Sequence, residues 1–400
     1  MTRPRALIST IEPVDGGVPT MTRCIADLLR ELEIEPVFAW YEPWSSQPRL
    51  SVPMYALPSG RRPGSVARPA YGDHEGHGIG AWLPELEFTH YLPRRPWREL
   101  IASCSYHLSV TGNPLCAAPF ARLGVPFLAW VATPWEADRT NRVRSFSRPR
   151  RWLDQGINSP VLQKLERQIL QAPGSHVLAL STYTSRALER IAGRPMDGVL
   201  LMPVDTRVFH PEPGKVRPWR LGFSGRYGDP RKHIDLLLEA VSLLKRQGQP
   251  VELELVGEKQ TNLLDAQLAD LQIADRVHCH SHLPASDLAG LLQGMDVFVI
   301  PSHQEGLCIA ALEAMACAVP VVSTRCGGPE EFVLDDHTGQ LTASDPAAMA
   351  AAISSICQDR DRRERLAQGA CRWINEHAST TSARDTFRRH FDAVYPSGPV

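Results

Sequence analysis

The stretch from Pro301 to Pro320 reads PSHQEGLCIAALEAMACAVP and decides the fold. The apolar run Asp296–Ile300 before it has the length of a buried strand, and Gly306–Cys317 continues as a helix. The free N–H groups and the dipole at the start of such a helix form an anion site. We therefore expect an α/β domain in which an anion-binding helix start follows one strand of a parallel sheet.

Two glutamates flank this helix start. Glu305 lies before the helix and Glu313 lies two turns along it. At the helical rise these eight residues span at most about 12 Å. Taken singly, either carboxylate would be assigned to the surface or to an ordinary ion pair. Together, two acceptor groups on opposite sides of an anion site match the layout of a nucleotide sugar, which runs from sugar to diphosphate to ribose.

Strands and helices alternate on both sides of this stretch, as in a parallel sheet covered on both faces. The expected strands are Ala6–Thr10, Tyr106–Val110, Phe127–Val131, His176–Leu180, Arg220–Ser224, Val251–Val256, Val277–His280 and Val319–Ser323. A helix with Thr20 as N-cap is expected to run to Leu32, and others cover 234–244 and 263–271. Residues 42–97, rich in Pro, Gly, Arg and Ser, are expected to form long loops with room for one strand.

Composition excludes several classes of protein. A hydrophobic content of 43% with 22% charged residues excludes a disordered chain. A net charge of -1 argues against a nucleic-acid partner. Nine cysteines without a C-x-x-C pair argue against a disulfide framework or a zinc site. No secretory signal is visible at the start, and we expect a cytoplasmic protein.

Charge is divided unevenly along the chain. Residues 1–210 carry 24 Lys and Arg against 19 Asp and Glu, a balance of +5, and the remainder carries a balance of -6. We therefore expect the first half to meet an anionic acceptor or a membrane surface. An arginine cluster is the candidate for peripheral contact with the inner face of the membrane, with a solvated loop or helix face as the alternative. Its members are Arg142, Arg144, Arg148, Arg150 and Arg151.

The glutamate pair resembles the Glu-x7-Glu signature of the family-4 retaining glycosyltransferases, which have the GT-B fold. Further likenesses in the second half are Gly225-Arg226 with Lys232, Val256-Gly257, Pro320–Val322, Gly327–Glu331 and Thr338–Leu341. The likeness in the first half is thinner and consists of Gly16-Gly17, Ser181 and the run Pro203–Asp205 with Phe209.

The resemblance implies two Rossmann-like, doubly wound parallel-sheet domains that face a cleft. Three prolines and a glycine in Phe209–Pro218 mark the linker between them. We expect residues 1–208 to form the acceptor-side domain and residues 209–380 to form the donor-binding domain. Residues 381–400 are expected to form a helix that returns to the first domain. The implied reaction is retaining transfer of a hexosyl group from a UDP- or GDP-linked sugar to a hydroxyl acceptor, without cofactor or metal.

The resemblance also assigns roles. Arg226 and Lys232 hold the donor diphosphate, and together with Glu305 they are the expected catalytic residues. Glu313 accepts hydrogen bonds from the ribose. The full donor-binding set is Gly16, Gly17, Gly225, Arg226, Lys232, Glu305, Gly306, Leu307, Cys308, Ile309 and Glu313.

Three departures from the family pattern stand out. His233 and Ala318 occupy positions that are usually glycine, and we expect the alanine to be a small change. The run Ala132–Glu136 stands where a histidine is usual, so no catalytic base is assigned. A non-catalytic sugar-nucleotide-binding protein and a sugar-nucleotide epimerase of the same fold therefore remain as alternatives.

Overall fold

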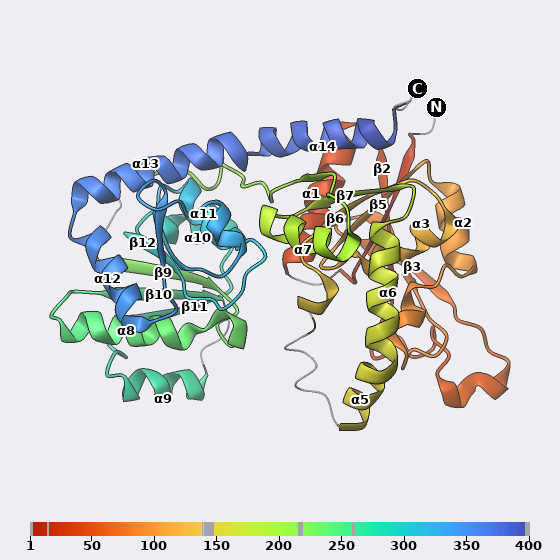
Figure 1. The fold of residues 1–400 in the computed structure, drawn as a ribbon, viewed down its shortest axis with the longest axis horizontal. Helices are drawn as coiled ribbons and strands as arrows, with labels where there is room; N and C mark the ends of the chain where they lie inside the picture. The colour runs from red at the N-terminus through yellow and green to blue at the C-terminus, as the bar shows by residue number, and fades with distance from the viewer. Residues whose placement is uncertain are drawn as a thin grey trace. The chain divides into compact units, whose positions relative to one another are not determined.

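The computed structural model describes residues 3–13, 16–137, 139, 148–214, 219–257 and 261–396. The chain forms two compact units (Figure 1). Unit 1 comprises Met1–Leu200 with Arg384–Val400, and unit 2 comprises Leu201–Ala383. The units thus divide after residues 200 and 383, whereas the sequence placed the divisions after residues 208 and 380.

Unit 1 contains an eight-stranded sheet with the order β3-β4-β2-β1-β5-β6-β7-β8. Its strands are β1 (Arg5–Thr10), β2 (Glu35–Tyr41), β3 (Ser65–Ala70), β4 (His74–Ile79), β5 (Tyr106–Thr111), β6 (Phe127–Val131), β7 (Ser175–Ala179) and β8 (Gly198–Val199). All neighbours pair in parallel except the edge strand β3, which is antiparallel to β4. Strands buried on both faces explain the continuous apolar runs in the sequence.

Helices cover both faces of this sheet. The helical segments are α1 (Gly17–Glu31), η1 (Met54–Ser59), η2 (Glu87–Tyr91), α2 (Arg95–Ser103), η3 (Pro114–Ala117), α3 (Ala118–Leu123), α5 (Arg148–Leu153), η4 (Asp154–Asn158), α6 (Ser159–Leu170), α7 (Thr182–Ala192) and α14 (Thr380–Val394). On one face Trp97, Phe120 and Leu162 of α2, α3 and α6 pack into a core with the strands. On the other face Phe391 of α14 contacts Tyr106 of β5, with ring centroids 5.1 Å apart.

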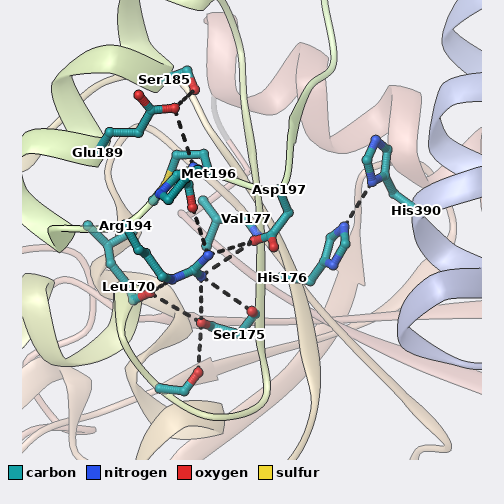
Figure 2. A network of polar contacts seen from close by, with 12 residues as sticks. Leu170, Ser175, His176, Val177, Ser185, Glu189, Arg194, Met196, Asp197 and His390 are labelled. Atoms are coloured by element: carbon teal, nitrogen blue, oxygen red, sulfur yellow. Dashed lines mark hydrogen bonds and ion pairs between the residues drawn. The ribbon is translucent and has the colours of Figure 1, made fainter.

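The helix α14 is held to unit 1 by polar contacts near both of its ends. The Arg384 guanidinium donates to the Glu31 carboxylate at 2.5 Å. Figure 2 shows His176 of β7 facing His390 of α14, with 2.9 Å between Nε2 and Nδ1. Burial lowers the pKa of both histidines, so the neutral forms are favoured in this contact.

Two expectations for unit 1 are wrong. The helix α1 begins at Gly17 with Gly16 as N-cap, and the Thr20 hydroxyl donates back to the Gly16 carbonyl inside the helix instead of capping it. Residues 42–97 contain two strands, β3 and β4, where room for one was expected. Glycines in β4 concealed that strand: a Cβ at Gly78 would lie 2.1 Å from the Glu42 carboxylate. The position selects glycine for close packing, although glycine is usually a weak strand former.

Unit 2 contains a six-stranded, wholly parallel sheet with the order β11-β10-β9-β12-β13-β14. Its strands are β9 (Arg220–Gly225), β10 (Glu252–Gly257), β11 (Val277–Ser281), β12 (Val297–Ile300), β13 (Val321–Thr324) and β14 (Gly339–Thr342). Its helical segments are η5 (Pro230–Lys232), α8 (Ile234–Arg246), α9 (Asn262–Asp270), α10 (Ala285–Leu292), α11 (Ile309–Ala316), η6 (Gly328–Glu331), α12 (Pro346–Cys357) and α13 (Arg360–His377). The expectation of two doubly wound parallel sheets is confirmed.

Each sheet reverses its strand order at one place. In unit 1 the reversal lies between β1 and β5, and in unit 2 it lies between β9 and β12. Ligands of doubly wound sheets bind at the carboxyl ends of the strands beside such a switch point. The loops that leave β1, β5, β9 and β12 are therefore the first places to look for function.

Candidate functional site

The switch point of unit 2 brings Lys232 and Glu305 together. Lys232 ends η5 after β9, and Glu305 follows β12. The Lys232 Nζ donates to Glu305 Oε1 at 2.7 Å, and the Ser302 hydroxyl donates to the same oxygen at 2.7 Å. Burial alone would lower the pKa of Lys232, but the Glu305 carboxylate outweighs burial and raises that pKa. A charged ammonium is thus held beside a carboxylate that is only 9% exposed.

Backbone hydrogen bonds fix the loop that carries Glu305. Its N–H donates to the Cys326 carbonyl at 2.8 Å, and its carbonyl accepts from the Gly328 N–H at 2.9 Å. A Cβ at Gly328 would lie 2.1 Å from the Gly306 carbonyl oxygen, so only glycine permits this approach. The glycine pair Gly327-Gly328 therefore allows the Glu305 loop to pack closely against it.

The helix after this loop begins later than the sequence indicated. Helix α11 starts at Ile309, not at Gly306, and Cys308 is its N-cap with φ 72°. Leu307 and Cys308 thus belong to a turn, because a left-handed residue cannot continue the helix backwards. Burial raises the pKa of the Cys308 thiol to about 12, which keeps it protonated and unsuited to be a nucleophile.

Glu313 lies on α11 and is half-buried. Burial raises the pKa of its carboxyl group to about 7. The carboxyl group is therefore partly protonated near neutral pH. A ligand that donates hydrogen bonds to Glu313 would favour the carboxylate and displace that proton.

Arg226 stands apart from the Lys232–Glu305 pair. Its side chain is 70% exposed, and its guanidinium lies 3.5 Å from Asp229 Oδ2. Asp229 also accepts from Arg231 at 2.8 Å. Gly225, which precedes Arg226, has φ 153°, and its carbonyl lies 2.1 Å from where a Cβ of Gly257 would be. The carboxyl ends of β9 and β10 therefore approach closely through glycine, and Arg226 follows β9 with an exposed side chain.

The two positions where glycine is usual in the family both have left-handed backbone. His233 has φ 46° and Ala318 has φ 59°. A Cβ is disfavoured in this conformation, so the alanine adds backbone strain, and the expectation that the change is small stays a prediction. The His233 ring stacks on His303 with centroids 3.8 Å apart, which holds the loop beside Lys232.

In unit 1, the predicted Gly16 and Gly17 lie after β1. Gly16 has φ 147°, a conformation that requires glycine, and Gly17 is the first residue of α1. Val14 and Asp15 fall outside the described residues. The role assigned to the two glycines stays a prediction.

Sequence reasoning missed a cavity of about 620 Å³ at the switch point of unit 1. Its polar and aromatic lining includes Thr10, Glu12, Tyr41, Glu87, His90 and Asn113. These residues come from separate segments, and three of them fall within or beside the region assigned to loops. The available signal was positional: Glu12 follows β1 and Asn113 follows β5, so both lie at carboxyl ends of neighbouring strands.

The segment after β6 is the place where the family usually has a histidine. In this chain the segment is held in position by buried groups. The Trp135 N–H donates to Glu166 Oε1 at 2.9 Å, and burial raises the pKa of Glu166 to about 7. The Arg139 guanidinium bridges Asp154 and Glu87. These contacts position the segment but supply no catalytic base.

The arginine cluster is only partly visible. Arg142 and Arg144 lie outside the described residues, while Arg148, Arg150 and Arg151 belong to α5. Among the helices of the described residues, none is long and apolar enough to cross a membrane. The described residues also contain no group of three or more His, Cys, Asp or Glu arranged to hold a metal ion.

Comparison with known proteins agrees with this architecture. The family model described as glycosyl transferases group 1 matches residues 206–373. The D-inositol 3-phosphate glycosyltransferase of Thermomonospora curvata is 31% identical over 249 residues, covering 55% of this chain and 57% of that protein. The MMP alpha-(1->4)-mannosyltransferase of Mycolicibacterium hassiacum is 32% identical over 223 residues, covering 54% and 52%. The chain thus spans about half the length of the curated relatives that it matches.

Solved structures are similar over nearly the whole chain. Sucrose-phosphate synthase from Thermosynechococcus elongatus has a TM-score of 0.71 at 17% identity, covering 99% of this chain and 100% of that one. HepE of Anabaena in complex with UDP also has a TM-score of 0.71, at 15% identity, covering 98% and 100%. At such identities the likeness establishes the fold alone. Residues 206–373 thus match the model of the glycosyl transferases group 1 family, and the two parallel-sheet units have the GT-B fold.

Proposed function

We propose that this protein is a retaining glycosyltransferase that moves a hexosyl group from a UDP- or GDP-linked sugar to a hydroxyl acceptor. The observation that carries the proposal is the contact between Lys232 and Glu305 at the switch point of unit 2. An ammonium suits a diphosphate, and a neighbouring carboxylate suits sugar hydroxyls and positive charge on the reacting ring.

In the resting protein the two side chains neutralise each other. When the donor binds, Lys232 turns its charge to the diphosphate, and Glu305 accepts from the sugar. Arg226, which is exposed, adds a second cation for the phosphates. Glu313 accepts from the ribose hydroxyls, and its ionised carboxylate is the stronger acceptor. HepE is named in complex with UDP and with UDP-glucose, which supports a uridine nucleotide as a first donor to test.

The reaction balances without a cofactor. The bond between the anomeric carbon and the phosphate oxygen breaks, and the electron pair leaves with the nucleoside diphosphate. The acceptor oxygen forms the new bond on the same face of the sugar, and its proton passes to the departing phosphate. Lys232 stabilises the negative charge that develops on that phosphate. No metal ion takes part in this proposal.

The acceptor is a hydroxyl compound. Curated relatives are named for transfer to D-inositol 3-phosphate and for α-(1→4)-mannosyl transfer, so polyols and saccharides form the acceptor panel. Peripheral contact with an anionic membrane through α5 is also proposed, since Arg148 is exposed there beside Trp152, which is 73% exposed.

The test is donor turnover by the full chain. UDP-glucose, UDP-N-acetylglucosamine and GDP-mannose are incubated with the acceptor panel, with and without EDTA, and the released nucleoside diphosphate is measured. Release that depends on acceptor and persists in chelator supports the proposal. A donor that changes into its epimer without release would show the epimerase alternative. Binding without any turnover would show the non-catalytic alternative.

A further inference from the structure

The cavity at the switch point of unit 1 has the size of a small-molecule site. Its volume of about 620 Å³ lies within the range of roughly 300–1,000 Å³ that is usual for ligand pockets. Thr10 and Asn113 line it from the carboxyl ends of β1 and β5. Tyr41 and His90 contribute a stacked pair of rings with centroids 3.7 Å apart. The lining is therefore both aromatic and polar, as in pockets for saccharides and other polyols.

The charged groups in the described lining are carboxylates. Glu12 and Glu87 both line the cavity, and no lysine or arginine is among its described lining residues. Each carboxylate has one nearby cation that it shares with another acid. Arg68 contacts Glu12 at 3.3 Å and also Glu42 at 3.0 Å.

The second carboxylate has the same arrangement. Arg139 contacts Glu87 at 2.6 Å and also pairs with Asp154. Across the two clusters four carboxylates face two guanidinium groups, so the negative charge is in excess. A negatively charged ligand would be repelled here.

His90 adds a further acceptor. Its Nε2 lies 3.0 Å from the Pro84 carbonyl, and because a carbonyl only accepts, that nitrogen carries the hydrogen. Burial lowers the pKa of His90, so the ring stays neutral and its Nδ1 is an acceptor. The Asn113 Oδ1 accepts from the Leu115 N–H at 3.1 Å, which leaves its amide group as a donor. The described lining thus offers acceptors on Glu12, Glu87 and His90 and a donor on Asn113.

We propose that this cavity binds a polyhydroxylated ligand without negative charge, with Glu12 and Glu87 selecting against phosphorylated and carboxylated compounds. Hydroxyl groups donate to the two carboxylates and His90, and accept from Asn113. Under the proposed transferase function this ligand is the hydroxyl acceptor, and to that extent the inference rests on that function. It differs from the anionic acceptor that the +5 charge balance of residues 1–210 led us to expect, because none of the cations that the structure describes there is a lining residue of the cavity.

The variants that test the inference are Glu12→Gln and Glu87→Gln. Both keep the shape of the side chain, and in each case the guanidinium retains its other carboxylate, so folding is expected to survive. Glu99→Gln is the matched control, because Glu99 pairs with Arg95 at 2.7 Å on the exposed face of α2. Thermal unfolding of all three variants checks that the fold is intact.

The experiment measures binding to the full chain by ligand-observed NMR. The probes are glucose with glucose 6-phosphate, and myo-inositol with its 3-phosphate, each at tens of millimolar. Only binding that Glu12→Gln or Glu87→Gln changes is assigned to the cavity. We expect the uncharged member of at least one pair to bind there and to lose roughly tenfold or more in affinity in each variant. The phosphorylated member is expected to bind more weakly in the wild type and to gain in the variants.

Three results would overturn the inference: no uncharged probe binds, the glutamine variants bind it as well as Glu99→Gln does, or the phosphorylated probe is preferred at the cavity. The readout is independent of turnover. A protein that binds the uncharged probe in this way but transfers no sugar would refute the proposed function and leave the inference standing.

Discussion

The switch points of the two sheets have the same topology but opposite chemistry. In unit 2 three cations, Arg226, Arg231 and Lys232, stand against Asp229 and Glu305. In unit 1 the cations at the switch point are outnumbered two to one by carboxylates. One edge is therefore suited to a diphosphate and the other to an uncharged polyol. The fold sets where ligands bind, and the charges in the loops set which ligands bind.

The largest effect is expected on catalysis, at the switch point of unit 2 where the cations are in excess. Glu305→Gln keeps the shape and the hydrogen bonds from Lys232 and Ser302 but removes the charge that faces the reacting sugar. We expect kcat to fall by about 10²–10³, as when one electrostatic contact to a transition state is lost. Asp275→Asn, which removes the exposed partner of Lys245 in the same unit, is the control and should leave kcat unchanged. A kcat within a few-fold of the wild type would remove Glu305 from the catalytic set.

The second prediction concerns how the affinity for UDP depends on pH, which distinguishes the switch point of unit 2 from that of unit 1. The pKa of Glu313 is raised to about 7, and its ionised carboxylate is a stronger acceptor for the ribose hydroxyls than the neutral acid is. Affinity for UDP is therefore expected to rise with pH up to about 7 by more than the titration of the UDP phosphate alone accounts for. In Glu313→Gln the affinity should be lower, and between pH 5 and 8 only the dependence that belongs to UDP itself should remain, as measured by calorimetry. A wild type whose pH dependence is no greater than that of Glu313→Gln would contradict the role of Glu313.

A third prediction concerns unit 1 and the contact between His176 and His390. Their folded pKa values are lowered, so the unfolded chain binds more protons at mildly acid pH. The free energy of unfolding should be complete above the ordinary histidine pKa of about 6.5 and should fall as pH drops below it. The loss is at most about 1.4 kcal/mol per pH unit for each histidine. Denaturant titrations of wild type and His390→Gln should differ in this slope, and parallel curves would exclude the histidine pair as its source.

The smallest effect is on the stability of unit 2. Ala318→Gly relieves a left-handed backbone at φ 59°, and we expect the free energy of unfolding to rise by about 0.5–1 kcal/mol. Gly290, which lies within α10 with open space around it, allows the converse substitution Gly290→Ala as a helix-propensity reference of similar size. A loss of stability in Ala318→Gly would mean that other contacts of the alanine methyl outweigh the strain.

The sequence predicted more of the strands and site residues of unit 2 than of unit 1, for physical reasons. The strands of unit 2 are short apolar runs separated by amphipathic helices, and Lys232 and Glu305 both follow strands that adjoin the switch point. The family resemblance predicted that both residues serve the donor site, and the positions of these strands explain why the two side chains meet. In unit 1 the edge strand β3 contains Pro69, and its neighbour β4 contains Gly76 and Gly78, which close packing requires. These three residues disguise the strands.

The start of α11 was misplaced for a related reason. Cys308 takes a left-handed conformation that is unusual for cysteine, and nothing in the local sequence indicates it. Likewise the cavity of unit 1 depends on Glu87 and His90, which reach the switch point through η2 and not through a strand. Tertiary contacts of this kind leave no periodic pattern in the sequence.

The contrast between the two edges rests most directly on Lys232, and calorimetry with bare UDP and GDP tests it. Lys232→Met removes the cation, whereas Glu305→Gln removes the carboxylate that neutralises it; Lys245→Met, which breaks the exposed contact with Asp275, is the matched control. We predict that Lys232→Met weakens the preferred diphosphate by about tenfold or more, that Glu305→Gln binds it as tightly as the wild type or more tightly, and that Lys245→Met has no effect. Unchanged affinity in Lys232→Met, or an equal loss in Glu305→Gln, would contradict the assignment of the unit 2 edge to the donor diphosphate.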